Sequence, residues 1–251
     1  MRSPALSVII PARDEESGIA SALAPFQTWT DTEIIVAVDD RCADATAERA
    51  AGMDGVRVLR RAGLGRGAAL ARGVDAANGQ MLLLLHADSR VDEGSVRAAA
   101  ARLDPGTAAV AFRMWIDSPR FVFRLLELGV NLRSKLFGLP YGDQGLLLRP
   151  GVLARAGGIR PLRRCEDLDL VLRLRRVGRI RLAKGACVTS ARRWERDGLA
   201  RVTVSNVMTL LRFLLRGGDV SHGQLDTHSR RLDLDRDPEP RRGSADSPGL
   251  G

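Results

Sequence analysis

The feature that most constrains the fold is a repeated alternation of strand-like and helix-like segments in the first hundred residues. Residues 6–12, 33–40, 56–60 and 80–87 are short, mainly apolar runs, and alanine-rich segments of helical character lie between most of them. Strand, helix and strand in close succession predict βαβ units and a mostly parallel sheet. Because the apolar runs show little polar alternation, we expect strands buried on both faces and hence an α/β fold.

The second half of the chain has a different character. The sequence predicts a strand at 107–116 and amphipathic helices, which mix apolar and basic residues, at 120–138 and 200–218. Towards the C-terminus the chain becomes charged, aperiodic and rich in proline, glycine and serine, which is typical of disorder. We therefore expect one folded domain over residues 1–224 and a disordered tail over residues 225–251.

The composition limits the class of protein. The net charge is +9, but the basic residues are almost all arginines spread along the chain, and only 4% of the residues are aromatic. Nucleic-acid binding favours clustered charge and stacking rings, so we expect an anionic small ligand or an anionic membrane surface and no nucleic acid. The three cysteines form no C-x-x-C pair and no signal peptide precedes them, so we expect no disulfides and a cytoplasmic setting.

Polar or turn-forming residues follow three of the predicted strands. The first strand closes with PAR at 11–13, the second with DD at 39–40, and the fourth with HAD at 86–88. A buried carboxylate is costly unless it is paired. Ligands of open parallel sheets bind beyond the carboxyl ends of the strands, so the sequence predicts a binding site at this rim.

Four segments, taken in order, resemble the motifs of family 2 glycosyltransferases. They are SVIIPARDEE, EIIVAVDDRCADAT, GRGAALARGVDAANGQMLLLLHADS and a longer segment that starts with YGDQG and ends with LRRVG. With TSARRWER, which together with LHADS and YGDQG resembles a bacterial glycosyltransferase-like subgroup, the similarity covers roughly residues 6–195. It implies the GT-A fold, a Rossmann-like and mostly parallel central sheet flanked by helices, with C-terminal amphipathic helices. It also implies a nucleotide-binding part over about 1–104 and an acceptor part over about 105–224.

The resemblance implies inverting transfer of a sugar from a nucleotide-sugar donor, a UDP- or GDP-sugar, to a hydroxyl acceptor. Asp40 would accept a hydrogen bond from the base or ribose, with Asp39 supporting it; the alternative is an Asx turn before the next helix. Arg66 and Gly67 open a predicted helix, where N-terminal amides and an arginine suit a diphosphate. The remaining residues implied at the donor lie in the strand-end loops: Pro11, Ala12, Arg13 and Ala87. For Arg13 the alternative is a solvated surface charge.

The resemblance also implies a divalent metal, Mn²⁺ or Mg²⁺, bound to the diphosphate. Asp88 matches the last acid of the family's D-x-D motif and is the expected ligand, because hard cations prefer carboxylate oxygens. His86 stands where the family has its first aspartate. Histidine is a poor ligand for Mg²⁺ but is accepted by Mn²⁺, so His86 either binds the metal, touches the ribose or caps the strand.

Glu166 and Asp167 match the family's E-D pair. The resemblance implies that Asp167 is the general base that takes the proton of the acceptor hydroxyl. The alternative is that both acids only complement the dipole of the helix that starts there.

Two further segments are candidates for contacts with the acceptor or for closure over the donor. In YGDQG we expect Asp143 and Gln144 to bind sugar or acceptor hydroxyls; the alternative is a glycine turn with exposed polar tips. In ARRWE we expect Arg193 to meet the diphosphate and Trp194 to stack on a sugar ring. The alternative there is a partly buried tryptophan beside a salt bridge.

Three questions stay open at the level of sequence. The helices at 120–138 and 200–218 fit either peripheral contact with a membrane surface or packing against the core. A non-catalytic sugar-nucleotide-binding module and a nucleotidyltransferase are the two rivals to a glycosyltransferase, and His86 in place of an aspartate favours the first of them. The acceptor and the oligomeric state are not predicted.

Overall fold

The computed structural model describes residues 4–162, 165–199, 201–205 and 208. The chain divides into a large unit, residues 1–207, and a small C-terminal unit that starts at Met208. The predicted tail at 225–251 and most of the helix predicted at 200–218 lie outside the described residues. Within the part that is described, no helix is both long enough and apolar enough to cross a membrane. All of the candidate site lies in the large unit.

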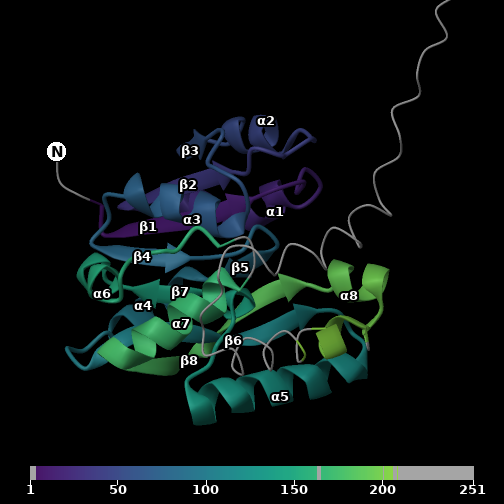
Figure 1. Ribbon diagram of the computed structural model, residues 1–251. Coiled ribbons are helices and arrows are strands. Elements are labelled where there is room, and N and C mark those ends of the chain that lie inside the picture. The colour runs from purple at the N-terminus through teal and green to yellow at the C-terminus, as the bar shows by residue number, and fades with distance from the viewer. Residues whose placement is uncertain (1–3, 163–164, 200, 206–207, 209–251) are drawn as a thin grey trace, which may run out of the picture. The chain divides into compact units, whose positions relative to one another are not determined.

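An eight-stranded sheet in the order β3-β2-β1-β4-β7-β6-β8-β5 forms the centre of the large unit (Figure 1). The neighbours among β1 to β4 pair in parallel, as do β6 and β8, whereas β7 runs antiparallel to β4 and β6, and β5 runs antiparallel to β8. The predicted α/β fold with a mostly parallel sheet is confirmed. The strands are β1 (Leu6–Ala12), β2 (Thr32–Val38), β3 (Val56–Leu59), β4 (Met81–Leu84), β5 (Ser89–Val91), β6 (Thr107–Asp117), β7 (Leu146–Leu148) and β8 (Arg179–Ser190).

Two strands of the sheet escape the prediction from sequence. β8 spans 12 residues, but its side chains are mostly half-buried or exposed and include Arg179, Arg181 and Lys184, so it lacks an apolar run. β5 has only three residues. β8 pairs with β5 and with β6, which both lie far from it along the chain, and a local pattern cannot show such pairing.

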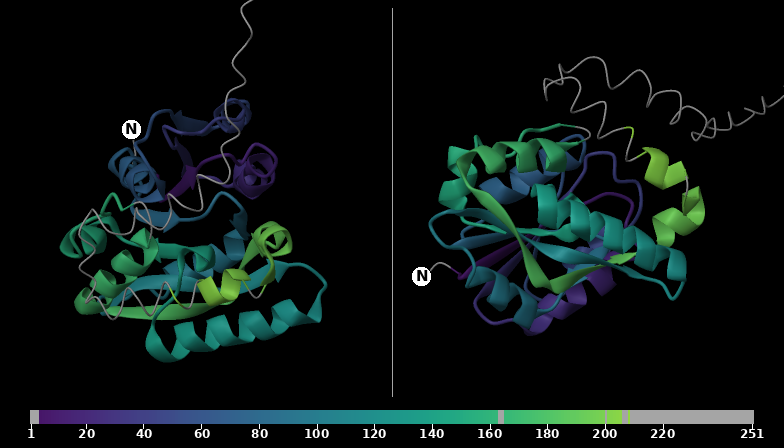
Figure 2. Two further views of the ribbon diagram at one scale, coloured as in Figure 1. Left: turned by 45° about the vertical axis from the view of Figure 1, so that its right-hand side comes forward. Right: turned by 90° about the horizontal axis from the view of Figure 1, so that it is seen from below.

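Helices cover both faces of the sheet (Figures 1 and 2). Val8 and Ile10 of β1 pack towards α1, α2 and α4, whereas Ile9 between them packs towards α3, α6 and α7. All seven residues of β1 are buried, as expected for a strand covered on both faces. The helices are α1 (Ile19–Leu23), η1 (Ala24–Thr28), α2 (Thr46–Ala51), α3 (Arg66–Asp75), α4 (Glu93–Ala100), α5 (Phe121–Phe137), η2 (Gly142–Gln144), α6 (Pro150–Arg155), α7 (Glu166–Val177) and α8 (Arg192–Asp197).

A third, smaller core lies at the far end of β6. There Met114 and Ile116 of β6 pack with Phe123 of α5 and Trp194 of α8. This core fixes α5 along the outer part of the sheet, where Figures 1 and 2 show it as a long helix beside β6 and β8.

Candidate functional site

The predicted site segments meet at one rim of the sheet. Because β1, β2 and β4 are parallel, their carboxyl ends share an edge. β7 runs antiparallel to β4 and pairs Leu146 with Leu84, so the segment 141–145 that precedes β7 arrives at the same rim. The first turn of α7 joins it there, because the Asp167 carboxylate accepts a hydrogen bond from the Gly142 amide.

Two backbone amides hold the carboxylate of Asp167. Its Oδ2 accepts from the Gly142 N–H at 2.9 Å and its Oδ1 accepts from the Leu168 N–H at 2.8 Å. Burial acts to raise the pKa of Asp167, but the Arg66 charge, these two amides and His86 together lower it below the ordinary value. Asp167 is therefore ionised at neutral pH, as a group that accepts a proton must be.

Gly142 fits tightly between His86 and Asp167. A Cβ atom at residue 142 would overlap Nε2 of His86 and would lie 3.2 Å from Oδ2 of Asp167. This close approach requires glycine. Burial, and then the Arg66 charge, lower the pKa of His86 to about 4 although Asp88 and Asp167 oppose the shift. The imidazole is therefore neutral at pH 7.

An ion pair joins the first residues of α3 and α7. Arg66 donates to Oε1 of Glu166, a side chain that is buried. Oε2 of Glu166 has no hydrogen-bond partner among the described residues, and burial raises the pKa of this carboxyl although Arg66 opposes the shift. Burial acts to lower the pKa of Arg66, but Glu166, Asp167 and Asp88 raise it, so Arg66 is a permanent positive charge facing three acids.

Asp88 and His86 are the residues that suit a metal ion. One oxygen of Asp88 accepts from the Ser89 hydroxyl at 3.2 Å. A carboxylate oxygen and a neutral imidazole nitrogen form a donor set that suits Mn²⁺ better than Mg²⁺. In the described ranges, neither residue belongs to a close cluster of three ligand groups, so a cation here would also need oxygens from its substrate, as is usual for metals that bind phosphates.

Asp143 is an unsatisfied acid beside Asp167. Its Oδ1 is buried and has no partner within the described part of the chain. Burial and then the nearby Asp167 raise the pKa of Asp143 to about 6, although Arg133 opposes the shift. Arg133 reaches this loop from α5 and stacks over the ring of Tyr141 at 3.7 Å. A buried polar atom without a partner often marks the place of a water or a polar ligand.

Gln144 does not fit its predicted contact with sugar or acceptor. The side chain is fully buried. Its amide nitrogen donates to the Phe112 carbonyl at 3.0 Å, and its amide oxygen accepts from the Ser134 hydroxyl at 2.6 Å. Because these bonds tie η2 to β6 and α5, Gln144 holds the loop in place.

Trp194 and Arg193 differ in their exposure to solvent. Trp194 is buried in the third core and packs edge-on against Phe123 at 6.2 Å between ring centroids. The prediction that Trp194 stacks on a sugar is therefore wrong for this arrangement, and the alternative of a buried tryptophan describes it. Arg193 is exposed, and its charge contributes, after burial and Arg66, to the low pKa of His86. Arg193 therefore lies near the rim.

Asp39 and Asp40 bind the loop that leads to α3. Asp39 is buried, and its carboxylate accepts from the Gly65 N–H at 2.6 Å and from the Arg41 N–H at 2.9 Å. The second bond is an Asx turn, the alternative that the sequence left open, but Asp39 makes it rather than Asp40. Asp40 is exposed and accepts from the Gly63 N–H at 2.8 Å. Asp39 thus supports the loop, and Asp40 is the accessible acid.

The start of α3 is not the open phosphate cradle that the sequence suggested. The Gly67 N–H donates to the Leu162 carbonyl at 3.2 Å, and the Gly65 N–H donates to Asp39. A Cβ atom at residue 67 would overlap the Leu162 carbonyl oxygen. The predicted role of Gly67 at the diphosphate is therefore corrected to close packing, and Arg66 is the group of this turn that faces the acids.

The other strand-end residues divide by exposure. Pro11, Ala12 and Ala87 are buried at the ends of β1 and β4. Arg13 is exposed and pairs with Asp14 at 3.2 Å, so the solvated-charge alternative describes it here.

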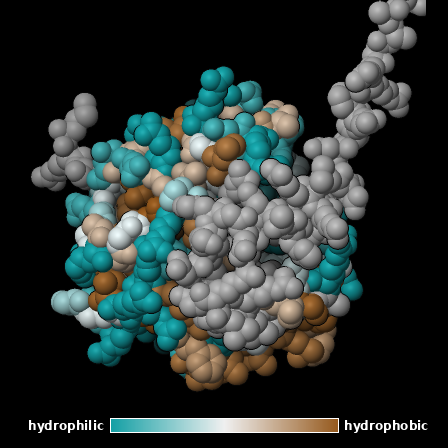
Figure 3. Space-filling model, in the orientation of Figure 1, coloured by the Kyte–Doolittle hydropathy of each residue, from teal (hydrophilic) through white to brown (hydrophobic). Residues whose placement is uncertain are grey.

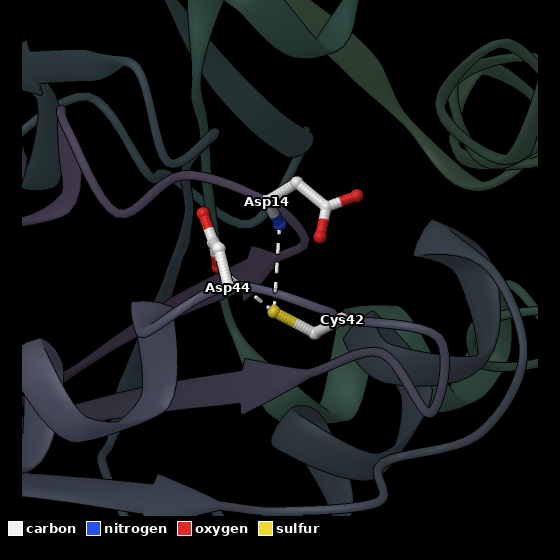
Figure 4. Close-up of side chains that lie close together, drawn as sticks. All are labelled: Asp14, Cys42 and Asp44. Carbon is white, nitrogen blue, oxygen red and sulfur yellow. Dashed lines mark hydrogen bonds between the residues drawn. The ribbon is translucent and has the colours of Figure 1, made fainter. Parts of the chain in front are cut away.

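A second group of potential ligands lies in the loops after β1 and β2 (Figure 4). The ligand atoms of Asp14, Cys42 and Asp44 lie within 4.8 Å of one another. Asp44, however, already accepts from the Glu16 N–H at 2.9 Å and from the Thr46 N–H at 3.0 Å. These side chains therefore hold the two loops together.

Two cavities flank the rim. One of about 20 Å³, the size of a single water, lies between His86 and Glu166. The other, of about 210 Å³, opens beside Asp88 and is lined by serines and by Arg90 and Arg192. The larger cavity lies next to the proposed metal ligand, where it offers space for a polar ligand.

Arg192 links the first loop to α8 beside this cavity. It donates to the Ser17 hydroxyl at 2.7 Å and to Oε2 of Glu15 at 3.2 Å. Burial and then Asp88 raise the pKa of Glu15 to about 7, although Arg192 opposes the shift. Glu15, Arg133 and Gly142 are the rim residues that the sequence analysis did not single out. Gly142 gave a weak signal, a glycine inside a polar loop before a strand.

The family model described as glycosyl transferase family 2 matches residues 7–165 of the chain. No curated protein matches the chain. Among solved structures, a mannosyltransferase from Pyrobaculum calidifontis in complex with GDP-Man and Mn²⁺ is 18% identical, with a TM-score of 0.58, over 75% of this chain and 57% of that one.

Two other similar structures point to the same fold. Staphylococcus aureus TarS 1-349 in complex with UDP-GlcNAc is 19% identical, with a TM-score of 0.56, over 74% of this chain and 58% of that one. Glucosyl-3-phosphoglycerate synthase from Mycobacterium tuberculosis, in complex with Mn²⁺, UDP and glucosyl-3-phosphoglycerate, is 20% identical, with a TM-score of 0.53, over 74% of this chain and 70% of that one. The chain thus spans less than two thirds of the length of the first two.

Proposed function

Because the chain belongs to glycosyl transferase family 2, we propose that it is an inverting glycosyltransferase that moves a sugar from a nucleotide-sugar donor to a hydroxyl acceptor. The proposed donor is a UDP- or GDP-sugar, since structures of the same fold bind GDP-Man or UDP-GlcNAc. The proposed metal is Mn²⁺ or Mg²⁺.

One observation carries the proposal: a candidate metal ligand, His86, and the candidate base, Asp167, far apart in sequence, both lie against Gly142, where a Cβ atom would overlap the first and lie 3.2 Å from the second. Asp88 and Asp167 both raise the pKa of Arg66, and both also influence His86. A module that only binds a donor needs the Asp88 side of this arrangement. An ionised acid beside it, held by two amides, is what attack by an acceptor requires in addition.

Asp167 is the proposed general base. The proton of the acceptor hydroxyl passes to its carboxylate while the acceptor oxygen forms a bond to the anomeric carbon. The bond from that carbon to the phosphate oxygen breaks, and the nucleoside diphosphate leaves with the electron pair. The sugar passes through an oxocarbenium-like transition state, and attack from the face opposite the leaving group inverts the anomeric centre. The Gly142 and Leu168 amides fix the direction in which the carboxylate points.

Asp88 and His86 would hold the divalent cation, which when bound offsets the negative charge that grows on the leaving diphosphate. Arg66 supplies a fixed positive charge at the same rim, and Arg193 is a second basic group near it. At the nucleotide end, Asp40 is the proposed acceptor for the base or ribose. Asp39 supports it by fixing the Gly65 loop.

Asp143 is the proposed contact for an acceptor hydroxyl. Its unpartnered Oδ1 lies near Asp167, so a hydroxyl bound there would satisfy a buried atom close to the base.

A donor screen tests the proposal. Thermal shifts are measured with UDP-, GDP- and dTDP-sugars in the presence and absence of Mn²⁺, because a ligand that binds only the folded protein raises its melting temperature. We expect one donor class to stabilise the protein and Asp88→Ala to remove the metal-dependent part of the shift. Asp54→Ala, at an exposed loop acid before β3, is the matched control and should keep the full shift.

The products separate the proposal from its rivals. Release of nucleoside diphosphate from the stabilising donor supports a glycosyltransferase. Binding without release would indicate a sugar-nucleotide-binding module, and release of pyrophosphate from a nucleoside triphosphate and a sugar phosphate would indicate a nucleotidyltransferase.

A further inference from the structure

The helix α5 carries a set of apolar side chains on its outer side. Six of them are 50–73% exposed, although other side chains of α5 pack against Met114 and Ile116 of β6. Five follow one another at intervals of three or four residues and so form one stripe along the helix. The stripe is defined here as Phe121, Leu125, Leu128, Leu132, Leu136 and the adjacent Phe137. Figure 3 shows hydrophobic residues gathered along the lower edge of the molecule, where α5 lies in Figure 1.

The inner face of α5 carries polar side chains beside apolar ones such as Phe123, which enters the third core. Beyond its short pairing with β7, β6 is bound on this side by side chains of α5. Glu127 accepts from the Ile116 N–H at 2.6 Å, and Asn131 accepts from the Met114 N–H at 2.8 Å and donates to the Met114 carbonyl at 3.1 Å. The helix thus satisfies the strand edge with polar groups. The helix is therefore apolar on both sides: one side packs against β6, and the stripe on the other side is left exposed for a partner.

The charges around the stripe identify the chemistry of that partner. Residues 113–138, all of them described, contain five basic side chains and two acids. Asp117 pairs with Arg90 at 2.7 Å, and the buried Glu127 accepts a hydrogen bond from β6. The exposed basic groups Arg113, Arg120 and Lys135 therefore have no acid of this segment left to balance them. Trp115, half exposed with Arg124 stacked over its ring at 3.8 Å, adds an aromatic of the kind common at membrane interfaces.

We propose that α5 docks the protein on an anionic lipid bilayer surface, with the apolar stripe in the interface and the flanking basic groups on lipid phosphates. An exposed apolar stripe between basic residues is the pattern of helices that lie in the plane of a membrane. Docking of a second copy through the same stripe would bring the basic ends of two α5 helices together. Like charges oppose that arrangement, whereas anionic headgroups favour the bilayer.

The docking helix also touches the candidate site. Arg133 stacks on Tyr141, and Ser134 donates to Gln144, so α5 supports the loop that contains Gly142 and Asp143. A bilayer bound to α5 would therefore lie next to this loop of the candidate site. The docking proposal needs no donor and no turnover, so it stands or falls independently of the proposed reaction.

Vesicle co-sedimentation tests the docking. The full chain is mixed with vesicles of phosphatidylcholine alone or of phosphatidylcholine with phosphatidylglycerol. We expect binding to the anionic vesicles that weakens as salt is added. The double variant Leu128→Ser, Leu132→Ser should lower the affinity about tenfold or more, because two apolar side chains no longer enter the interface. Its melting temperature should stay unchanged, since both side chains face away from the fold.

Two matched controls locate the surface. Leu64→Ser removes an exposed apolar side chain from the loop before α3 and should bind as the wild type does. Arg120→Glu with Lys135→Glu should weaken binding, whereas Arg61→Glu with Arg155→Glu, both exposed elsewhere, should weaken it much less. Equal losses in test and control variants, or no binding to anionic vesicles, would overturn the proposal. A dimer in solution that the Leu128, Leu132 variant dissociates would also overturn it, in favour of a second copy.

Discussion

Two groups of carboxylates lie at the same rim of the sheet, and they are satisfied to different degrees. In the loop after β2, Asp39, Asp40 and Asp44 accept hydrogen bonds from backbone amides at 2.6–3.0 Å. Around η2 and α7, Asp143 and Glu166 each keep a buried oxygen that has no partner within the described residues. The first group mainly holds loops together, and the second keeps buried carboxylate oxygens that the described residues leave without a hydrogen-bond donor.

This difference separates the acids that stabilise the fold from the acids that are available for chemistry. The amides that the first group binds belong to neighbouring loops, so this group would orient the proposed nucleotide end through the loops it fixes. Perturbed pKa values gather at functional sites. Here the raised pKa of Asp143 and the lowered pKa of His86 lie beside Asp167.

The largest expected effect is on turnover at α7. Asp167→Asn keeps an oxygen that can accept from Gly142 but removes the base, so nucleoside diphosphate formation with acceptor should fall about 10³-fold while donor affinity is retained. Asp44→Asn, in the loop group, is the matched change and should leave turnover near the wild-type rate. Steady-state kinetics and donor titrations measure both. Equal losses in the two variants would remove the distinction between the groups.

The next effect comes from the close approach at Gly142. Gly142→Ala places a methyl group on His86 and Asp167, so we expect a loss of about 1–3 kcal/mol in unfolding free energy and about a hundredfold loss in turnover, because the base is displaced. Gly129→Ala is the control: nothing lies within 4 Å of the added atom, and it sits inside α5. That substitution should stabilise the protein by about 0.5–1 kcal/mol. Urea unfolding compares the two, and a stabilised Gly142→Ala variant would contradict the packing described here.

A third effect concerns pH. The folded-state pKa of Asp143, about 6, exceeds its unfolded value of 3.8. Between these values the folded protein binds more protons than the unfolded chain, so this group reduces stability as the pH rises. Asp143→Asn should therefore stabilise the protein by about 1–2 kcal/mol at pH 7, and the gain should shrink as the pH falls towards 4.

Urea unfolding at both pH values measures the gain from Asp143→Asn. Glu195→Gln, at an exposed acid of α8, should show no such dependence. An equal gain at pH 7 and at pH 4 would mean that the pKa of the Asp143 carboxyl is not raised in the folded protein.

The smallest effect belongs to the loop group. Asp44→Ala removes the side chain that binds the Thr46 and Glu16 amides, so it should cost about 1 kcal/mol of stability. Turnover at saturating donor should change little, because Asp44 lies outside the group around Asp167. Thermal unfolding and steady-state rates check the two parts. A large loss of turnover without a loss of stability would assign Asp44 to the chemistry instead.

The sequence predicts the strand ends of this rim well because the information there is local. An apolar run that stops at DD or HAD marks a strand and its polar end, and parallel pairing then brings Asp40 and Asp88 to the same edge. The α7 acids become part of the rim through the Gly142–Asp167 bond, which joins positions 25 residues apart. Family resemblance predicted their role, whereas local periodicity alone gave only a helix start.

What the sequence could not show depends on partners that are distant along the chain. Gln144 looks like an exposed loop tip, yet Phe112, 32 residues away, and Ser134 bury and bind it. Gly67 looks like part of a phosphate loop, yet its amide is taken by Leu162. β8 has no apolar run, yet it is a strand because long-range pairing with β6 and β5 holds it in the sheet.

The most direct test of the central claim, that Asp88 and Asp167 serve one site in different roles, is calorimetric titration of the full chain with UDP or GDP. Titrations with and without Mn²⁺ are run on the wild type, on Asp88→Ala and on Asp167→Asn. We predict metal-dependent binding that Asp88→Ala abolishes and Asp167→Asn preserves, with Asp167→Asn inactive in transfer. Loss of binding in both variants, or in neither, would contradict it.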